Sequence, residues 1–186
     1  MFIQTEATPN PATLKFIPGR PVLSEGAVEY RDQAESESSP LAARLFEIDG
    51  VRGVFLGSDF ISVTKGDGEW QNLKPAILGA IMEQYMSGEA MTADGASEQA
   101  DGEKEFFEPE DEDTVKTIKE LLDTRVRPAV AQDGGDITFQ GYRDGVVFLH
   151  MRGACAGCPS STATLRHGIE NLLRHFIPEV QEVRPI

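Results

Sequence analysis

The two cysteines of the chain, Cys155 and Cys158, are separated by two residues. They stand among small residues in the stretch 153–160, which reads Gly-Ala-Cys-Ala-Gly-Cys-Pro-Ser. Thiolates at this spacing bind one soft metal ion or one iron of a cluster, or they form a redox-active disulfide. Pro159 suits the first position of a helix, and the positive end of a helix dipole favours thiolate over thiol. The stretch therefore predicts a metal or redox site and not two inert core thiols.

The number of ligands limits the kinds of metal site. Tetrahedral zinc and cubane iron–sulfur clusters each require four ligands, and one chain offers two thiols. His167 and His175 fall well inside the helix expected after the cysteines, and we interpret them and His150 as surface residues. Four ligands are reached most simply when two copies of the chain contribute two cysteines each. The spacing alone does not distinguish a bridged zinc ion from a bridged cluster.

Two other interpretations of the CxxC motif remain open on the residues alone. A thiol–disulfide oxidoreductase also places this motif at the start of a helix, but here a β-hairpin precedes it and no tryptophan is near. A zinc-bridged dimeric interaction module is the second alternative. The sequence contains no nucleophile–base pattern, phosphate-binding loop or zincin motif, so we expect a protein that is not an enzyme.

The residues around the motif predict a small α+β domain, residues 114–186, with the order α-β-β-α-β. An amphipathic helix with Asp113 as its cap is expected first, with a kink or a new turn at Pro128. A tight turn at 133–136 leads into strands at 137–139 and 146–151. The sequence then predicts a helix over 159–176 and a last strand over 180–183, so the cysteines lie between a hairpin and a helix.

An acidic segment, residues 88–113, precedes this domain. It holds eleven acidic residues and one lysine, so it carries −10 of the chain's formal net charge of −14. A segment of this composition does not bury enough apolar surface to fold by itself, and we expect a flexible, extended linker in which Phe106 and Phe107 dock transiently on a domain. Without a basic face, no nucleic-acid partner is expected.

Residues 1–87 predict a second small α+β domain with the order β-β-α-β-β-α. Strands are expected at 2–5 and 14–17, followed by an exposed polar loop at 24–38. Ser39 and Pro40 are a typical helix start, and Gly50 ends that helix. A hairpin over 54–64 and a long helix ending at 87–88 complete the domain. We find no site in this domain from its sequence.

The compartment is predicted from the first residues and from the absence of long apolar runs. No run approaches the eighteen or so residues that a membrane-spanning helix needs, so no membrane partner is expected. The opening residues 1–6 lack the pattern of a secretory signal or a transit peptide. We therefore expect a bacterial cytoplasmic protein, with a trimmed organellar form as the alternative.

The motifs at both ends of the chain resemble one protein family. Residues 153–161, with Thr164-Leu165 after them and Asp133-Gly134-Gly135-Asp136 before them, are similar to the C-terminal NifU-like domain. Residues 1–6 and 8–19 resemble the N-terminal domain of Nfu proteins. Together the two resemblances cover nearly the whole chain outside the acidic segment.

The resemblance implies an iron–sulfur cluster scaffold or carrier. It implies a 4Fe–4S cluster bridged between the two protomers of a homodimer, with a 2Fe–2S cluster as the alternative. Cys155 and Cys158 match the family's ligand positions. The implied partners are an upstream assembly scaffold and apo iron–sulfur client proteins that receive the cluster.

Overall fold

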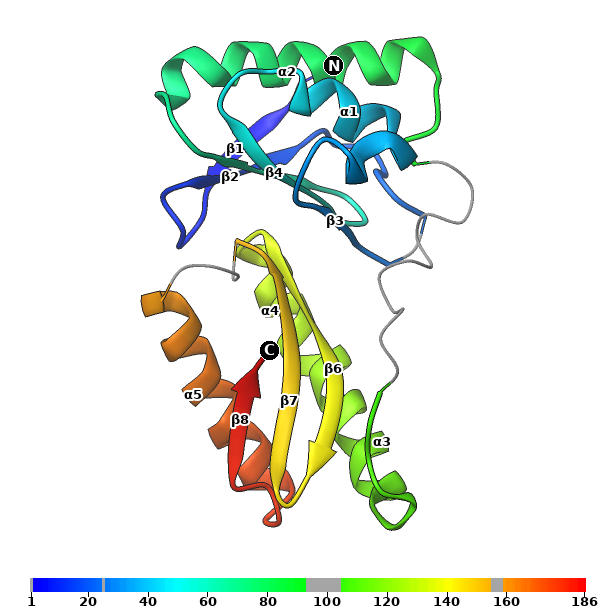
Figure 1. Ribbon diagram of the computed structural model, residues 1–186, viewed down its shortest axis with the longest axis vertical. Helices are drawn as coiled ribbons and strands as arrows, with labels where there is room; N and C mark the ends of the chain where they lie inside the picture. Colours follow the sequence, from blue (N-terminus) through cyan, green and yellow to red (C-terminus); the bar gives the residue numbers. More distant parts are fainter. Residues whose placement is uncertain (1, 25, 93–104, 155–158) are drawn as a thin grey trace. The chain divides into compact units, whose positions relative to one another are not determined.

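The computed structural model describes residues 2–24, 26–92, 105–154 and 159–186. The chain divides into two compact units, Met1–Gly102 and Glu103–Ile186. Each unit has its own β-sheet, its own helices and its own hydrophobic core (Figure 1). The predicted architecture of two small α+β domains is therefore confirmed.

The first unit is a five-stranded antiparallel sheet covered on one face by two helices (Figure 1). Its strand order is β1-β2-β5-β4-β3. The helices close over a core that includes Phe16, Leu41 and Ile77, none of which is accessible to solvent. The elements of this unit are β1 (Gln4–Ala7), β2 (Thr13–Ile17), β3 (Val28–Tyr30), α1 (Pro40–Phe46), β4 (Val51–Leu56), β5 (Ile61–Lys65) and α2 (Trp70–Ser87).

Two details of this unit differ from the sequence predictions. The polar stretch 24–38 was expected to be an exposed loop, but it contains edge strand β3, which pairs with β4, and the short 3-10 helix Glu35–Ser38. Val28 and Tyr30 are buried, and a three-residue alternation surrounded by polar residues is too short to stand out. Strand β1 also begins later than expected, and Phe2 is 85% exposed.

The helix ends of the first unit follow the expected chemistry. The Ser39 hydroxyl oxygen accepts a hydrogen bond from the N–H of Ala42 at 3.1 Å, as a helix N-cap does. Helix α2 ends at Gly88, whose φ of 71° is a conformation that glycine adopts without strain.

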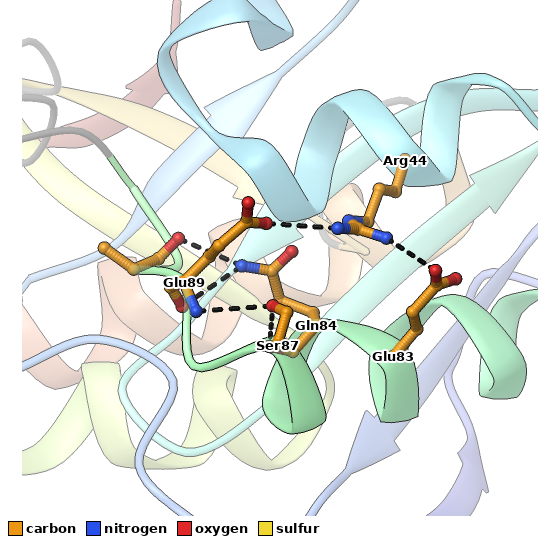
Figure 2. A network of polar contacts seen from close by, with 6 residues as sticks. Arg44, Glu83, Gln84, Ser87 and Glu89 are labelled. Atoms are coloured by element: carbon orange, nitrogen blue, oxygen red, sulfur yellow. Dashed lines mark hydrogen bonds and ion pairs between the residues drawn. The ribbon is translucent and has the colours of Figure 1, made fainter.

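Beyond α2 the chain folds back on the same unit (Figure 2). Arg44 of α1 forms ion pairs with Glu83 of α2 and with Glu89, both at 3.1 Å. The buried Gln84 amide donates hydrogen bonds to the backbone carbonyls of Glu89 and Ala90. The first residues of the predicted linker are therefore held to the first unit.

The second unit is a three-stranded sheet with helices packed on it, in the predicted α-β-β-α-β order. Strands β6 and β7 form an antiparallel hairpin, and β8 pairs with β7 in parallel. The core contains Ile118, Ile137 and Leu149, which are fully buried. The elements of this unit are α3 (Glu112–Leu121), a π-helical turn (Leu122–Val126), α4 (Arg127–Gln132), β6 (Gly135–Arg143), β7 (Val146–Gly153), α5 (Pro159–Phe176) and β8 (Glu182–Pro185).

Helix α3 and the chain before β6 show how local chemistry sets the boundaries. Asp111, not Asp113, is the N-cap residue of α3. The expected irregularity at Pro128 is a π-helical turn followed by α4, because proline lacks an N–H and crowds the preceding turn. The predicted turn at 133–136 is shorter than expected, since β6 already begins at Gly135. The hairpin turn has positive φ at Asp144 and Gly145, as a two-residue loop requires.

The end of the predicted linker belongs to the second unit. Phe106 forms an isolated parallel β-bridge with Gly141, and a 3-10 helix spans Pro109–Asp111. Residues 93–104 of the predicted linker lie outside the described residues. Within the described part of the chain, no helix is long and apolar enough to cross a membrane.

Candidate functional site

The predicted site lies between two well-defined elements of the second unit. Strand β7 ends at Gly153, and helix α5 begins at Pro159. Cys155 and Cys158 fall within residues 155–158, which are outside the described residues. Their role as ligands therefore stays a prediction, and the structure describes what holds the two ends of their segment.

The strand side of the site is built from glycines. Gly135 of β6 lies opposite Gly153 of β7, and the N–H of Ala154 donates to the carbonyl of Gly134 at 3.3 Å. Gly134 and Gly153 have φ values of 80° and 67°, which L side chains rarely adopt. The chain therefore leaves β7 through a turn that depends on glycine, directly before the first cysteine.

An arginine fixes the β6 strand below this turn. The Arg127 guanidinium donates to both carboxylate oxygens of Asp136, Nε to Oδ1 at 3.0 Å and Nη2 to Oδ2 at 3.0 Å. It also contacts Asp123 at 3.1 Å, and the hydrogen bond to Asp136 raises the pKa of Arg127 above its usual value. Asp136 lies opposite Arg152, the residue before Gly153. A bidentate pair restricts orientation as well as distance, so Arg127 ties the helical segment to the strand that carries the turn.

The helix side of the site is the N-terminus of α5. This helix has 18 residues and packs through Ile169 and Leu173, which belong to the core of the second unit. Backbone N–H groups of a first turn and the helix dipole favour anionic groups such as thiolates next to them. The apolar residues at helical spacing over 165–173 pack in or against this core, whereas Phe176 is 46% exposed and lies beside Arg125.

The structure also places the other residues weighed as ligands. His150 lies on β7, opposite Thr138, while His167 and His175 are on α5 beyond its first turn. His175 packs edge-on against the ring of Phe176. No group of three histidine, cysteine or acidic residues suited to a metal occurs within the described residues, a statement that does not include residues 155–158.

Asp133 and Asp136 do not form a hard-metal pair. Asp133 is the C-cap residue of α4, and the carboxylate of Asp136 is engaged by Arg127. Arg127 is the residue of this region that sequence analysis missed. Its spacing from Asp123 is that of an ordinary surface pair on a helix, and only the fold brings Asp136 to it.

Family models match both units of the chain. A model described as "Scaffold protein Nfu/NifU N terminal" matches residues 3–88, and one described as "NifU-like domain" matches residues 118–184. The second match contains the hairpin, the cysteine segment and helix α5.

Curated relatives match along the whole chain. The protein named "NFU1 iron-sulfur cluster scaffold homolog, mitochondrial" from Homo sapiens is 48% identical over 189 residues, which cover 100% of this chain and 72% of that protein. "NifU-like protein 5, mitochondrial" from Arabidopsis thaliana is 49% identical over 187 residues, 98% of this chain and 67% of that protein. The chain spans 65% of the length of the similarly named protein from Drosophila sechellia.

A solved structure also resembles part of the chain. It is the solution structure of a NifU-like protein from Saccharomyces cerevisiae, 26% identical, with a TM-score of 0.46. The match covers 50% of this chain and 86% of that chain.

The expectation of a bacterial cytoplasmic protein is wrong by this comparison. The relatives from fly, human and Arabidopsis named above are mitochondrial proteins by their names. The expectation was based on the absence of a leader in residues 1–6, and the first residues of a chain that spans only part of its relatives carry no information about the compartment.

Proposed function

This chain belongs to the Nfu/NifU-like family of iron–sulfur cluster scaffold proteins, and we propose that it holds a 4Fe–4S cluster between two copies of itself and passes it to apo-proteins. Cys155 and Cys158 of each copy are the proposed ligands. The cluster is cargo in this proposal, and the protein is a carrier and not a catalyst. The names of its relatives favour an organellar address.

The observation that carries the proposal is the support at both ends of the cysteine segment. A glycine turn fixed to β6 lies before it, and the N-terminus of an 18-residue helix lies after it. The two thiolates of one chain supply half of the four ligands that a cubane requires. The simplest completion is a second copy, and separation of the two copies would then release the cluster.

Release follows from the same arrangement. Thiolates of an acceptor protein replace those of Cys155 and Cys158 one at a time, and the bridged dimer separates as the cluster leaves. No redox change of the protein is needed, because ligands are exchanged and the iron and sulfide are conserved. The implied partners are an upstream assembly scaffold and apo iron–sulfur clients.

Anaerobic reconstitution of the full chain tests this function. Iron and sulfide are measured, the cluster type is read by Mössbauer spectroscopy, and the oligomeric state is read by sedimentation of the loaded species. The expected result is about four irons and four sulfides per dimer. A loaded monomer without an added small thiol would contradict the proposal.

The same preparation separates the two alternative functions. A zinc-bridged module gives colourless protein that retains stoichiometric zinc in air. A thiol–disulfide oxidoreductase gives a two-electron couple and turnover with a disulfide substrate, which Cys155→Ser abolishes. Either result without cluster binding would replace the proposed function.

A further inference from the structure

A short segment within the predicted linker lies along the edge of strand β6 that does not pair with β7. The N–H of Phe106 donates to the carbonyl of Gln140 at 3.1 Å, and the carbonyl of Phe106 accepts from the N–H of Tyr142 at 2.9 Å. These two bonds make the parallel bridge to Gly141, the residue between them. Residues 105–107, which we call the strap, therefore lie along the edge of the sheet and pair with it through a single bridge residue, Phe106.

The sheet is shaped to receive the ring of Phe106. The pairing of β6 with β7 shifts between Phe139 and Gly141, which bends β6 at this point. A Cβ atom on Gly141 would lie 2.4 Å from the ring of Phe106, so the ring rests where a side chain is missing. The ring also packs on Phe148 of β7, with centroids 5.1 Å apart.

Two cations flank the ring and the residue before it. The guanidinium carbon of Arg143 lies 5.6 Å from the centre of the Phe106 ring, within the range of a cation–π contact. Lys119 of α3 forms an ion pair with Glu105. The surface thus recognises three features of the strap, namely an extended backbone, an aromatic ring and a preceding carboxylate.

We propose that this edge of β6 is a peptide-binding site for extended segments of partner proteins that carry an acidic residue followed by an aromatic one. The strap fills the site within the same chain and competes with the partner. Recognition by an added strand gives affinity through the backbone, while pockets for side chains give specificity. The ion pair with Lys119 selects an acidic residue, and the contact of Arg143 with the ring selects an aromatic one after it.

This site is independent of the cysteines and of cluster binding. Gly141 pairs near the hairpin turn at Asp144 and Gly145, whereas Gly153 marks the opposite end of β7. A partner segment therefore binds the sheet without entering the turn that carries the cysteine segment. Failure of peptide binding would leave the proposed carrier function untouched, and the reverse also holds.

The test is fluorescence anisotropy of a labelled peptide with the sequence of residues 103–110, titrated with the full-length chain. Phe106→Pro removes both the ring and the N–H donor, so it opens the site. Phe106→Ala is a milder second variant. Phe107→Ala is the matched control, because Phe107 is 37% exposed and its removal leaves the bridge residue in place. Gly141→Ala in the Phe106→Pro background closes the pocket with a Cβ atom.

We expect the peptide to bind Phe106→Pro at least about tenfold more tightly than wild type, because the strap occupies the site in most wild-type molecules. Phe107→Ala should bind like wild type. The double variant Phe106→Pro, Gly141→Ala should lose binding, as should a peptide with alanine at both phenylalanines. Amide exchange at Tyr142 should increase in Phe106→Pro and fall again when peptide is added.

Three outcomes would overturn the proposal. The first is that neither Phe106→Pro nor Phe106→Ala binds the peptide. The second is that binding survives Gly141→Ala, and the third is that wild type binds as tightly as the two Phe106 variants. A wild-type dimer that dissociates on Phe106→Pro would assign the site to the strap of a second copy and would contradict the choice of a partner protein. Melting curves of each variant verify that the second unit is folded.

Discussion

At the scale of single residues, the chemistry proposed for this chain depends on two thiols in a segment that the fold holds at both ends. Arg127 contributes by joining Asp123 of the π-helical turn to Asp136 of β6. Removing one member of such a group leaves a carboxylate without its charged donor, at a cost that the partial exposure of Arg127 keeps near the upper end of the range for exposed pairs. The residues that position the strand before the cysteine segment can therefore be tested in the same way as the cysteines.

Replacing either thiol tests the proposed ligands. Cys155→Ser and Cys158→Ser should each reduce bound iron by at least about tenfold, because serine is a poor ligand for iron–sulfur clusters. Thermal unfolding of the apo-protein should be nearly unchanged, because serine replaces cysteine with a side chain of similar size. Iron content after anaerobic reconstitution is the measurement, and full iron retention by both variants would remove these residues from the site.

Arg127→Gln tests whether the arginine positions the cysteine segment. The substitution should lower the free energy of unfolding by about 1 kcal/mol, a value appropriate to an ion pair whose arginine is 37% exposed. The thiols of the apo-protein should react with iodoacetamide several-fold faster, because the turn before them is less restrained. Alkylation rates followed by mass spectrometry measure this effect directly.

Arg174→Gln is the matched control for this arginine. Arg174 also forms an ion pair, with Glu170 at 3.2 Å, but it lies in the last turn of α5, away from the cysteine segment. Arg174→Gln should lower the free energy of unfolding by about as much as Arg127→Gln, but it should leave the alkylation rate of the thiols unchanged. Equal acceleration in both variants would mean that Arg127 acts only through general stability.

At the scale of elements, the sequence predicts the helices and hairpins that have a strong apolar period or a typical turn. It does not predict the elements that form only through contacts with distant segments. Asp144 and Gly145 predict the β6–β7 hairpin, and the apolar spacing of 165–173 predicts helix α5. Strand β3 was missed because three residues are too few to show a strand pattern, and the strand is defined by its pairing with β4. The strap was missed because Phe106 needs Gly141, 35 positions later, to form its bridge.

The same dependence on distant residues appears at the second edge of the small sheet. Strand β8 lies at that edge, where an unpaired row of N–H groups would invite association with another strand. The N–H of Val183 instead donates to the carboxylate of Glu170 at 3.3 Å, and Pro185 has no N–H to offer. Edge β8 is therefore blocked, which leaves β6 as the edge that accepts a strand.

The N-cap of α1 gives a prediction at this scale. Ser39 is fully buried, its oxygen accepts from the N–H of Ala42, and its hydroxyl donates to the carbonyl of Met91. Ser39→Ala should therefore destabilise the first unit by about 1–2 kcal/mol, the upper range for an N-cap. Ser38→Ala is the control, since Ser38 makes only long contacts of 3.4 and 3.5 Å.

Urea unfolding followed by the fluorescence of Trp70, the only tryptophan, measures this change in the first unit. The control should stay within about 0.5 kcal/mol of wild type. If Ser39→Ala and Ser38→Ala lowered the free energy of unfolding equally, the N-cap hydrogen bond would contribute no specific stability.

At the scale of the whole molecule, the two units have hydrophobic cores that share no residue, and the acidic segment lies between them in the sequence. The charge follows the same division, because residues 88–113 carry −10 while residues 114–186 carry eight acids and nine bases. Like charges along a segment favour extension, so an extended linker stays our prediction for residues 93–104, which lie outside the described residues. Separate cores predict separate unfolding.

Core variants matched across the two units test this separation. Leu149 of β7 and Ile81 of α2 are each fully buried in a different core. Leu149→Ala should destabilise the second unit by about 2–5 kcal/mol through lost burial and the cavity it leaves. At ordinary urea dependences this shifts the unfolding midpoint of that unit by about 1 M or more.

The single tryptophan distinguishes the two units in the same experiment, because Trp70 belongs to the first unit. The tryptophan curve should be unchanged in Leu149→Ala, while the ellipticity curve of the whole chain gains an earlier transition. Ile81→Ala should do the opposite and shift the tryptophan curve. If Leu149→Ala moved the tryptophan midpoint as far as the ellipticity midpoint, the two units would unfold as one, and a carrier built from independent halves would be the wrong description.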